Sequence, residues 1–204
     1  MKIKICGLKY RDNIEAITVL KPDYVGFICY APSPRFAAEL DNETLVAIPG
    51  TIAKTAVFVN ETAETIDKLI DTYHFDAIQL HGNEDPELCE VFNGRVTVIK
   101  AFGIDKDFDF GQLEQYVDGA DFFLFDAKTD NHGGSGKSFD WSLLDNYKLD
   151  VPFFLSGGLS MDNLEEVKVI KHPQFYGVDL NSRFEIEPGL KDVDKLKNAF
   201  ELLR

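Results

Sequence analysis

The sequence has few cysteines, a shortage of positive charge and no long hydrophobic run, and each shortage excludes a class of protein. The three cysteines, Cys6, Cys29 and Cys89, are scattered without a C-x-x-C spacing, so neither a disulfide framework nor a zinc site is expected. No apolar run approaches the length of a membrane span. Met1 to Gly7 also lacks the apolar stretch of a signal peptide. We therefore expect a cytoplasmic chain without a membrane partner.

Acidic side chains outnumber basic ones, 35 Asp and Glu against 21 Lys and Arg, and the formal net charge is −14. Such a surface repels nucleic-acid backbones, so no nucleic-acid partner is expected. A small anionic substrate is still compatible with this charge, because a few donors in a cleft outweigh the average surface. The 204 residues, 45% of them hydrophobic, suffice for one sizeable core and predict a single domain over residues 1–204.

Short β-rich runs recur roughly every 20 to 30 residues, each followed by a polar turn and a segment with helical spacing. The expected strands are 2–6, 24–29, 54–59, 77–80, 96–101, 122–125, 153–155 and 176–179. The expected helices are 11–20, 42–47, 63–73, 86–92, 113–117, 141–146, 161–169 and 193–203. Strands such as 122–125 are apolar on both faces, as helix-covered parallel strands are. This pattern predicts an α/β fold, a single-domain (β/α)8 TIM barrel.

A doubly wound open sheet shows the same alternation of strands and helices. No G-x-G-x-x-G motif follows the first expected strand, which disfavours that fold. The longest irregular stretch, Ala127–Phe139, is polar and carries Gly133, Gly134 and Gly136. We predict that it is a mobile loop over the functional site rather than a domain boundary.

Two residue types suited to proton transfer end strands of the expected barrel, where barrel enzymes have their active sites. Cys6 ends the first strand and Asp126 follows the sixth. A thiolate removes protons well when nearby donors stabilise it, and a carboxyl enclosed by apolar groups more readily keeps a proton to donate. Taken alone, Cys6 could be a small buried hydrophobe and Asp126 a helix cap. Together, on one rim, they form an acid and base pair.

The last two strands are followed by residues suited to binding a phosphate. Gly157 and Gly158 offer unobstructed backbone N–H groups before a helix expected to begin near Ser160, and Asn181 and Ser182 follow the eighth strand. Many barrels bind phosphate with glycines and a helix N-terminus at these two positions. A pair of glycines also makes an ordinary tight turn, so the position of the pair carries the interpretation.

Arg35 and His81 complete the set of candidate residues. Arg35 follows a Pro-Ser-Pro turn and could grip a carboxylate with its planar fork, or lie solvated on the surface. His81 ends the fourth strand, where it could be an acid, a base or a structural histidine. The remaining histidines have no metal-ligand spacing, so no metal is expected.

Several segments together resemble one family. They are Lys4-Ile5-Cys6-Gly7-Leu8, Gln79-Leu80-His81-Gly82, Phe125-Asp126, Phe139-Asp140-Trp141, Leu155-Ser156-Gly157-Gly158-Leu159, and Glu185 with Pro188-Gly189-Leu190-Lys191-Asp192. In this order, across nearly the whole chain, they resemble phosphoribosylanthranilate isomerase of tryptophan biosynthesis. K-I-C-G at the start, with the sixth-strand Asp and the late G-x-x-K-D, is the specific part of the pattern.

The resemblance implies a cofactor-free Amadori rearrangement of N-(5-phosphoribosyl)anthranilate, a small phosphorylated substrate, to a 1-deoxyribulose 5-phosphate. It implies that Asp126 is the general acid at the ribose ring oxygen and that Cys6 is the general base at the C2′ proton. The substrate-binding residues that it implies are Arg35 at the anthranilate carboxylate, Asp179 near the sugar, and Gly158 and Ser182 at the phosphate. We add Gly157, Asn181 and His81 to this set from their positions at the strand ends.

Two residues depart from the family pattern, because Arg183 stands where a small residue is expected and Lys9 where threonine is frequent. One alternative is another sugar-phosphate barrel, an indole-3-glycerol-phosphate synthase or a histidine-pathway aminoaldose isomerase. The first would need a lysine as acid, and the second an aspartate in place of Cys6. The other alternative is a non-catalytic phosphate-metabolite binder, which has no use for an acid and base pair. The sequence leaves a monomer and a homodimer both open.

Overall fold

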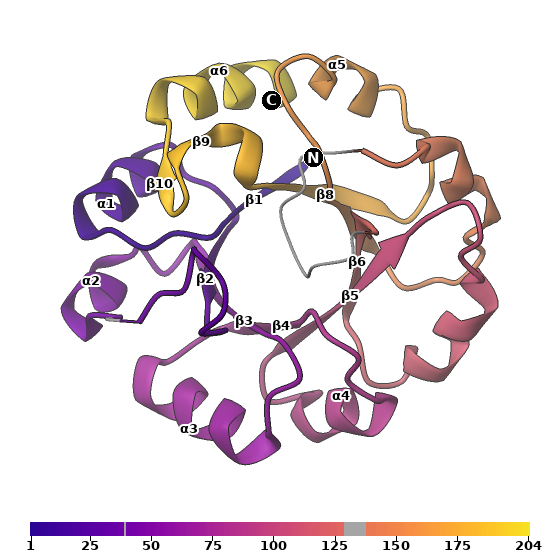
Figure 1. Ribbon diagram of the computed structural model, residues 1–204, viewed down its shortest axis with the longest axis horizontal. Helices are drawn as coiled ribbons and strands as arrows, with labels where there is room; N and C mark the ends of the chain where they lie inside the picture. The colour runs from indigo at the N-terminus through magenta and orange to yellow at the C-terminus, as the bar shows by residue number, and fades with distance from the viewer. Residues whose placement is uncertain (39, 129–137) are drawn as a thin grey trace.

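The computed structural model describes residues 1–38, 40–128 and 138–204. Its central feature is a ring of parallel strands, each paired with the next along the chain and the last with the first, surrounded by helices (Figure 1). The strands are β1 (Lys2–Cys6), β2 (Tyr24–Ile28), β3 (Ala53–Phe58), β4 (Ala77–Leu80), β5 (Thr97–Ile104), β6 (Phe122–Ala127), β7 (Phe153–Leu155) and β8 (Phe175–Leu180). The predicted (β/α)8 barrel is confirmed, and the open doubly wound sheet is excluded.

Helices cover the outside of this barrel. They are α1 (Arg11–Val19), α2 (Asn42–Ala47), α3 (Ala63–Tyr73), α4 (Pro86–Phe92), α5 (Leu164–Val167) and α6 (Val193–Leu203). Side-chain caps fix several starts: the carboxylate of Asp85 accepts the N–H of Leu88 at α4, and that of Asp192 accepts the N–H of Lys195 at α6. No helix within the described ranges is long and apolar enough to cross a membrane.

Three of the predicted helices differ from the observed elements. Segments predicted as helices at 113–117 and 141–146 are the 3-10 helices η1 (Phe110–Tyr116) and η2 (Trp141–Asn146). Their capping carboxylates, Asp109 and Asp140, accept the N–H two residues ahead, which favours a tight first turn. The helix predicted at 161–169 shortens to α5. Residues 129–137 of the predicted mobile loop lie outside the described residues, so that prediction stays untested.

A small hairpin after β8 was not predicted. A 3-10 turn, η3 (Ser182–Phe184), leads into β9 (Glu185–Glu187), which pairs antiparallel with β10 (Leu190–Lys191). The turn between the two strands contains Gly189 with φ +91°, a backbone angle that side chains other than hydrogen rarely allow. The pairing sets Lys191 directly opposite Glu185.

The core has two parts, one between the barrel and its helices and one inside the barrel. The inner part is built on Ile99, Ala101, Leu124 and Phe154. Tyr24 of β2 and Phe154 of β7 have ring centroids 5.3 Å apart although their strands are not neighbours, so these rings meet across the barrel interior. Because alternate residues of a strand share a face, Asp126 lies on the same inner face of β6 as Leu124.

Candidate active site

Asp126, His81 and Gly157 come together at the carboxyl ends of β6, β4 and β7. One carboxylate oxygen of Asp126, Oδ1, accepts the N–H of Ala127 at 2.8 Å, and Oδ2 lies 3.4 Å from Nε2 of His81. Nδ1 of His81 lies 2.7 Å from the amide nitrogen of Gln79, which orients the imidazole. A Cβ atom on Gly157 would lie 2.8 Å from Oδ1 of Asp126, so only glycine allows this approach. The side chains of Asp126 and His81 remain partly exposed, at 16% and 21%.

Cys6 is buried at the end of β1, opposite Gly26 of β2. A Cβ atom on Gly26 would lie 2.8 Å from Sγ of Cys6, so this glycine makes room for the thiol. The next residue, Gly7, has φ +77°, and a Cβ atom there would lie 2.8 Å from Oδ1 of Asn181 and 2.9 Å from Cδ of Arg35. The residue that follows Cys6 therefore lies close to two of the predicted binding residues.

Buried charges surround the Cys6 thiol. Burial raises the pKa of Cys6, and Asp179 acts in the same direction, while the cations of Lys4 and Lys191 oppose the rise. Nζ of Lys4 lies 3.1 Å from Oδ2 of Asp179, and both side chains are almost fully buried. Burial disfavours the charge on Lys4, but Asp179 and the Cys6 thiol outweigh this effect and raise the pKa of Lys4. The thiol thus lies beside a lysine that is held in its charged form.

The charge of the buried Asp179 interacts with those of Cys6 and Asp126. Its charge influences the titration of Cys6, and Asp126 and His81 in turn influence the titration of Asp179. Burial raises the pKa of Asp179, and the Lys4 ammonium opposes that shift. Oδ1 of Asp179 is buried and has no hydrogen-bond partner among the described residues, so this oxygen remains an unused acceptor.

Arg35 is not solvated but paired with Glu185, a partner that the sequence did not indicate. The Arg35 guanidinium donates from Nη2 to Oε2 of Glu185 at 2.7 Å and from Nε at 3.0 Å. Lys191 donates to Oε1 of the same carboxylate at 2.8 Å. Glu185 belongs to the family pattern, but no local sequence signal indicates its contact with a residue 150 positions away.

A cavity of about 730 Å³ lies beyond β7 and β8, where the sequence predicts phosphate binding. Its described lining includes Gly158, Ser160, Asn163, Arg183 and Lys195. The predicted helix start near Ser160 is wrong: the amide of Asn163 accepts the N–H of Ser160 and donates to the carbonyl of Gly158, so a turn occupies this segment before α5.

Asn181 and Ser182 are absent from the described lining of this cavity. The side-chain oxygen of Asn181 accepts a hydrogen bond from Nζ of Lys191 at 2.7 Å, on the side of the site that holds Cys6 and Arg35. Ser182 begins η3 directly after it. Among the residues that the structure describes, no group of three His, Cys, Asp or Glu side chains is arranged to hold a metal ion.

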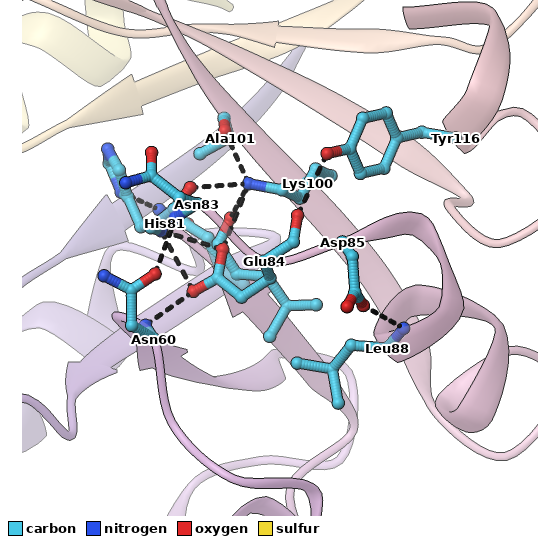
Figure 2. A network of polar contacts seen from close by, with 12 residues as sticks. Asn60, His81, Asn83, Glu84, Asp85, Leu88, Lys100, Ala101 and Tyr116 are labelled. Atoms are coloured by element: carbon cyan, nitrogen blue, oxygen red, sulfur yellow. Dashed lines mark hydrogen bonds and ion pairs between the residues drawn. The ribbon is translucent and has the colours of Figure 1, made fainter.

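Another buried ion pair, also missed from the sequence, supports the β4 end of the site (Figure 2). Nζ of Lys100 lies 3.1 Å from Oε2 of Glu84 and donates to the carbonyl of Gly82 at 2.9 Å. Glu84 also accepts the N–H groups of Asn60 and Gly82. Burial lowers the pKa of Lys100, and Glu84 opposes that shift. This pair fixes the loop that directly follows His81.

A closed (β/α)8 barrel with a thiol, a carboxyl and an imidazole at the carboxyl ends of its strands defines a TIM-barrel enzyme. The sequence model of one family, N-(5'phosphoribosyl)anthranilate (PRA) isomerase, matches residues 3–202. The chain belongs to this family. The resemblance found in the sequence motifs is thereby confirmed.

Known members of the family resemble the chain over nearly its whole length. An N-(5'-phosphoribosyl)anthranilate isomerase from Parabacteroides distasonis is 45% identical over 204 residues, which cover 98% of this chain and 92% of the relative. The structure of phosphoribosyl anthranilate isomerase from Thermotoga maritima is 33% identical with a TM-score of 0.85, covering 100% of this chain and 98% of that one. A structure of the isomerase in complex with reduced 1-(o-carboxyphenylamino)-1-deoxyribulose 5-phosphate is 30% identical with a TM-score of 0.81, at the same coverage.

Proposed function

We propose that the chain isomerises N-(5-phospho-β-D-ribosyl)anthranilate to 1-(2-carboxyphenylamino)-1-deoxy-D-ribulose 5-phosphate in tryptophan biosynthesis, without a cofactor. Family membership over residues 3–202 supports this reaction. The observation that supports the assignment of roles is the position of Cys6 and Asp126 at the carboxyl-terminal ends of β1 and β6, on the same side of the barrel. An acid and a base at the same end of one barrel suit a reaction that moves protons at neighbouring atoms of one sugar.

Asp126 is the general acid of this proposal. Its carboxyl protonates the ribose ring oxygen while the bond from that oxygen to C1′ breaks, and the anthranilate nitrogen lone pair forms the C1′=N bond of an iminium ion. The carboxylate that remains is held by the N–H of Ala127, and the nearby Nε2 of His81 can donate to its second oxygen. A proton donor held on two sides keeps its direction during the reaction.

Cys6 is the general base. The positive iminium nitrogen acidifies the C2′ proton, the thiolate removes that proton, and the resulting enolamine tautomerises to the product ketone. Burial raises the pKa of Cys6 and so opposes the thiolate form, while Lys4 and Lys191 favour it. The two buried cations thus offset part of the penalty that burial places on the thiolate, although the pKa of Cys6 remains raised.

Substrate binding divides between two ends of the pocket. At one end Arg35 would bind the anthranilate carboxylate, and at the other the backbone of Gly157, Gly158 and Ser182 would bind the phosphate. The unused acceptor oxygen of Asp179 suits a ribose hydroxyl group, which donates a hydrogen bond. Neighbouring His81 and Asn181 would complete the contacts to the sugar.

The test of function is an assay in which anthranilate and phosphoribosyl pyrophosphate form the substrate in situ through a coupled transferase. Loss of substrate fluorescence is followed with wild type, Cys6→Ser, Asp126→Asn and the control Cys89→Ala, whose thiol lies on the outer helix α4. We expect each of the first two substitutions to lower kcat by about a hundredfold or more, and the control to keep wild-type turnover.

Three outcomes would contradict this proposal. Near-normal turnover by Cys6→Ser or Asp126→Asn would refute the role of that residue. If the wild-type protein does not turn over the substrate, the proposed isomerase function is refuted. Comparable turnover of a histidine-pathway aminoaldose would point instead to the related sugar-phosphate barrels.

The proposed role of Arg35 is tested by binding rather than turnover. We expect Arg35→Leu to weaken binding of a reduced product analogue by about 1–3 kcal/mol, the cost of leaving a charged group without its partner. Isothermal titration calorimetry measures this difference, and an unchanged affinity would remove Arg35 from the binding site.

A further inference from the structure

The hairpin β9–β10 builds a charged cluster behind Arg35. Glu185 on β9 accepts hydrogen bonds from Arg35, at 2.7 Å from Nη2, and from Nζ of Lys191 on β10, at 2.8 Å. The backbone N–H of Gly189, in the turn of the same hairpin, donates to Oε1 of Glu185 at 3.1 Å. One carboxylate therefore joins two cations from different parts of the chain.

Lys191 is fixed within this cluster from several sides. Its Nζ also donates to the side-chain oxygen of Asn181 at 2.7 Å. Its backbone N–H and C=O both bond the amide of the buried Asn13 on α1, at 2.8 and 2.9 Å. The Lys191 side chain is completely buried and that of Glu185 is 4% exposed, whereas 12% of Arg35 reaches the surface. Only the arginine is thus available to a ligand.

The arginine also retains a donor for that ligand. Arg35 uses Nε and Nη2 for Glu185, and its Nη1 donates to no residue in the described part of the chain. A guanidinium presents donors on more than one edge, so one edge can be held by the protein while another meets a carboxylate.

Lys191 determines the net charge that such a ligand meets at Arg35. Arg35 and Glu185 alone form a neutral pair, which would offer an anionic group little net attraction. With Lys191 protonated, the three side chains together carry a net charge of +1. Burial lowers the pKa of Lys191, and the charge and hydrogen bond of Glu185 oppose that shift. Burial opposes the ionised form of Glu185, but its hydrogen bonds to Arg35 and Lys191 outweigh this effect and lower the pKa of Glu185.

We infer that Lys191 is a positioning residue for recognition of the substrate carboxylate: it offsets the charge of Glu185, so that Arg35 is both held in place and left with uncompensated positive charge. This inference rests on the proposed function, because it assigns the anthranilate carboxylate to Arg35. Lys191 itself is buried and does not touch the substrate.

The test compares two ligands that differ in one group, the reduced product analogue and the same compound without its ring carboxylate. Their dissociation constants are measured by calorimetry with wild type, Lys191→Met, Glu185→Gln, the double variant and the control Lys197→Met, whose side chain is exposed on α6. The ratio of the two dissociation constants reports recognition of the carboxylate alone. Thermal unfolding of each variant reports its fold.

We expect Lys191→Met to reduce the preference for the carboxylate ligand about tenfold or more, by removing the charge that offsets Glu185. Glu185→Gln should keep or increase the preference, since glutamine can still accept a hydrogen bond from Arg35 without cancelling its charge. The double variant should recover the preference that Lys191→Met loses, and Lys197→Met should match wild type. If the role of Lys191 were purely structural, Lys191→Met would lower the affinity for both ligands equally, and adding Glu185→Gln would not restore it.

Two results would overturn the inference while leaving the function intact. In the first, Lys191→Met loses the same factor of affinity for both ligands. In the second, the double variant binds the carboxylate ligand no more tightly than Lys191→Met does. If wild type turns over the substrate but shows no preference for the carboxylate ligand, the role of Arg35 fails with the inference. If wild type neither turns over the substrate nor binds either ligand, the proposed function fails.

Discussion

Adding one methyl group opposite the thiol tests the role of Cys6 without changing any titratable group. In Gly26→Ala the new Cβ atom would lie 2.8 Å from Sγ of Cys6 and 3.2 Å from its Cα atom. Non-bonded atoms in contact lie about 3.5–4.0 Å apart, so the overlap with the sulfur is roughly 1 Å. The two strands cannot easily separate, because the carbonyl of Gly26 accepts the N–H groups of Gly7 and Leu8, each at 3.0 Å.

The thiol must therefore move, and the size of the effect follows from this displacement. A misplacement of about 1 Å in a reacting group can cost on the order of a hundredfold in rate. We expect kcat of Gly26→Ala to fall by about that factor, with a loss of stability of about 1–3 kcal/mol from overpacking. The assay follows substrate fluorescence at saturating substrate, with urea unfolding measured in parallel.

Gly50→Ala is the matched control, because a Cβ atom there meets no atom within 4 Å and the backbone angle is ordinary. We expect this variant to retain wild-type kcat. A folded Gly26→Ala variant with kcat within a few-fold of wild type would refute the reasoning, since it would show that the position of the thiol does not limit the reaction.

Two further predictions concern the buried lysines. Lys100→Met leaves the carboxylate of Glu84 buried without its cation, and we expect the free energy of unfolding, measured in urea, to fall by about 3–5 kcal/mol; a loss below 1 kcal/mol would contradict this. Lys4→Met removes a cation that lowers the pKa of the Cys6 thiol. Alkylation of Cys6 by iodoacetamide, followed against pH by mass spectrometry, should then reach its half-maximal rate at a higher pH than in wild type, and an unchanged profile would exclude this role of Lys4.

The barrel was predictable because each of its strands is recognisable from a short run of consecutive residues. Every predicted strand overlaps an observed one. Strands that are buried on both faces are continuous apolar runs, such as Phe122–Phe125, and can be recognised within a few residues. Their carboxyl ends then indicate where reactive side chains gather. Asp126 and His81, which are 45 positions apart in the numbering, meet for this reason.

The hairpin and the charge pairs were not predictable from such patterns. β9 and β10 have three and two residues, too few to show an alternation. Lys4 and Asp179 are separated by 175 positions, and Arg35 and Glu185 by 150. The sequence could place Arg35 and Asp179 at the site, but it could not identify Glu185 and Lys4 as their partners. Only the closed barrel brings each pair together and makes burial of these charges tolerable.

Buried lysines also explain how an acidic protein can receive an anionic substrate. The net charge of −14 lies mostly on exposed side chains, whose influence fades beyond about 8 Å at physiological ionic strength. Lys4 and Lys191 lie inside, where two charges 4 Å apart interact by about 4 kcal/mol at an effective dielectric constant near 20, against about 1 kcal/mol in water. At Arg35 the buried Lys191 therefore leaves a local net charge of +1 despite the many exposed carboxylates, whereas at the thiol the charge of Lys4 is balanced by Asp179. Neutralising exposed carboxylates should accordingly change substrate affinity less than removing the buried Lys191.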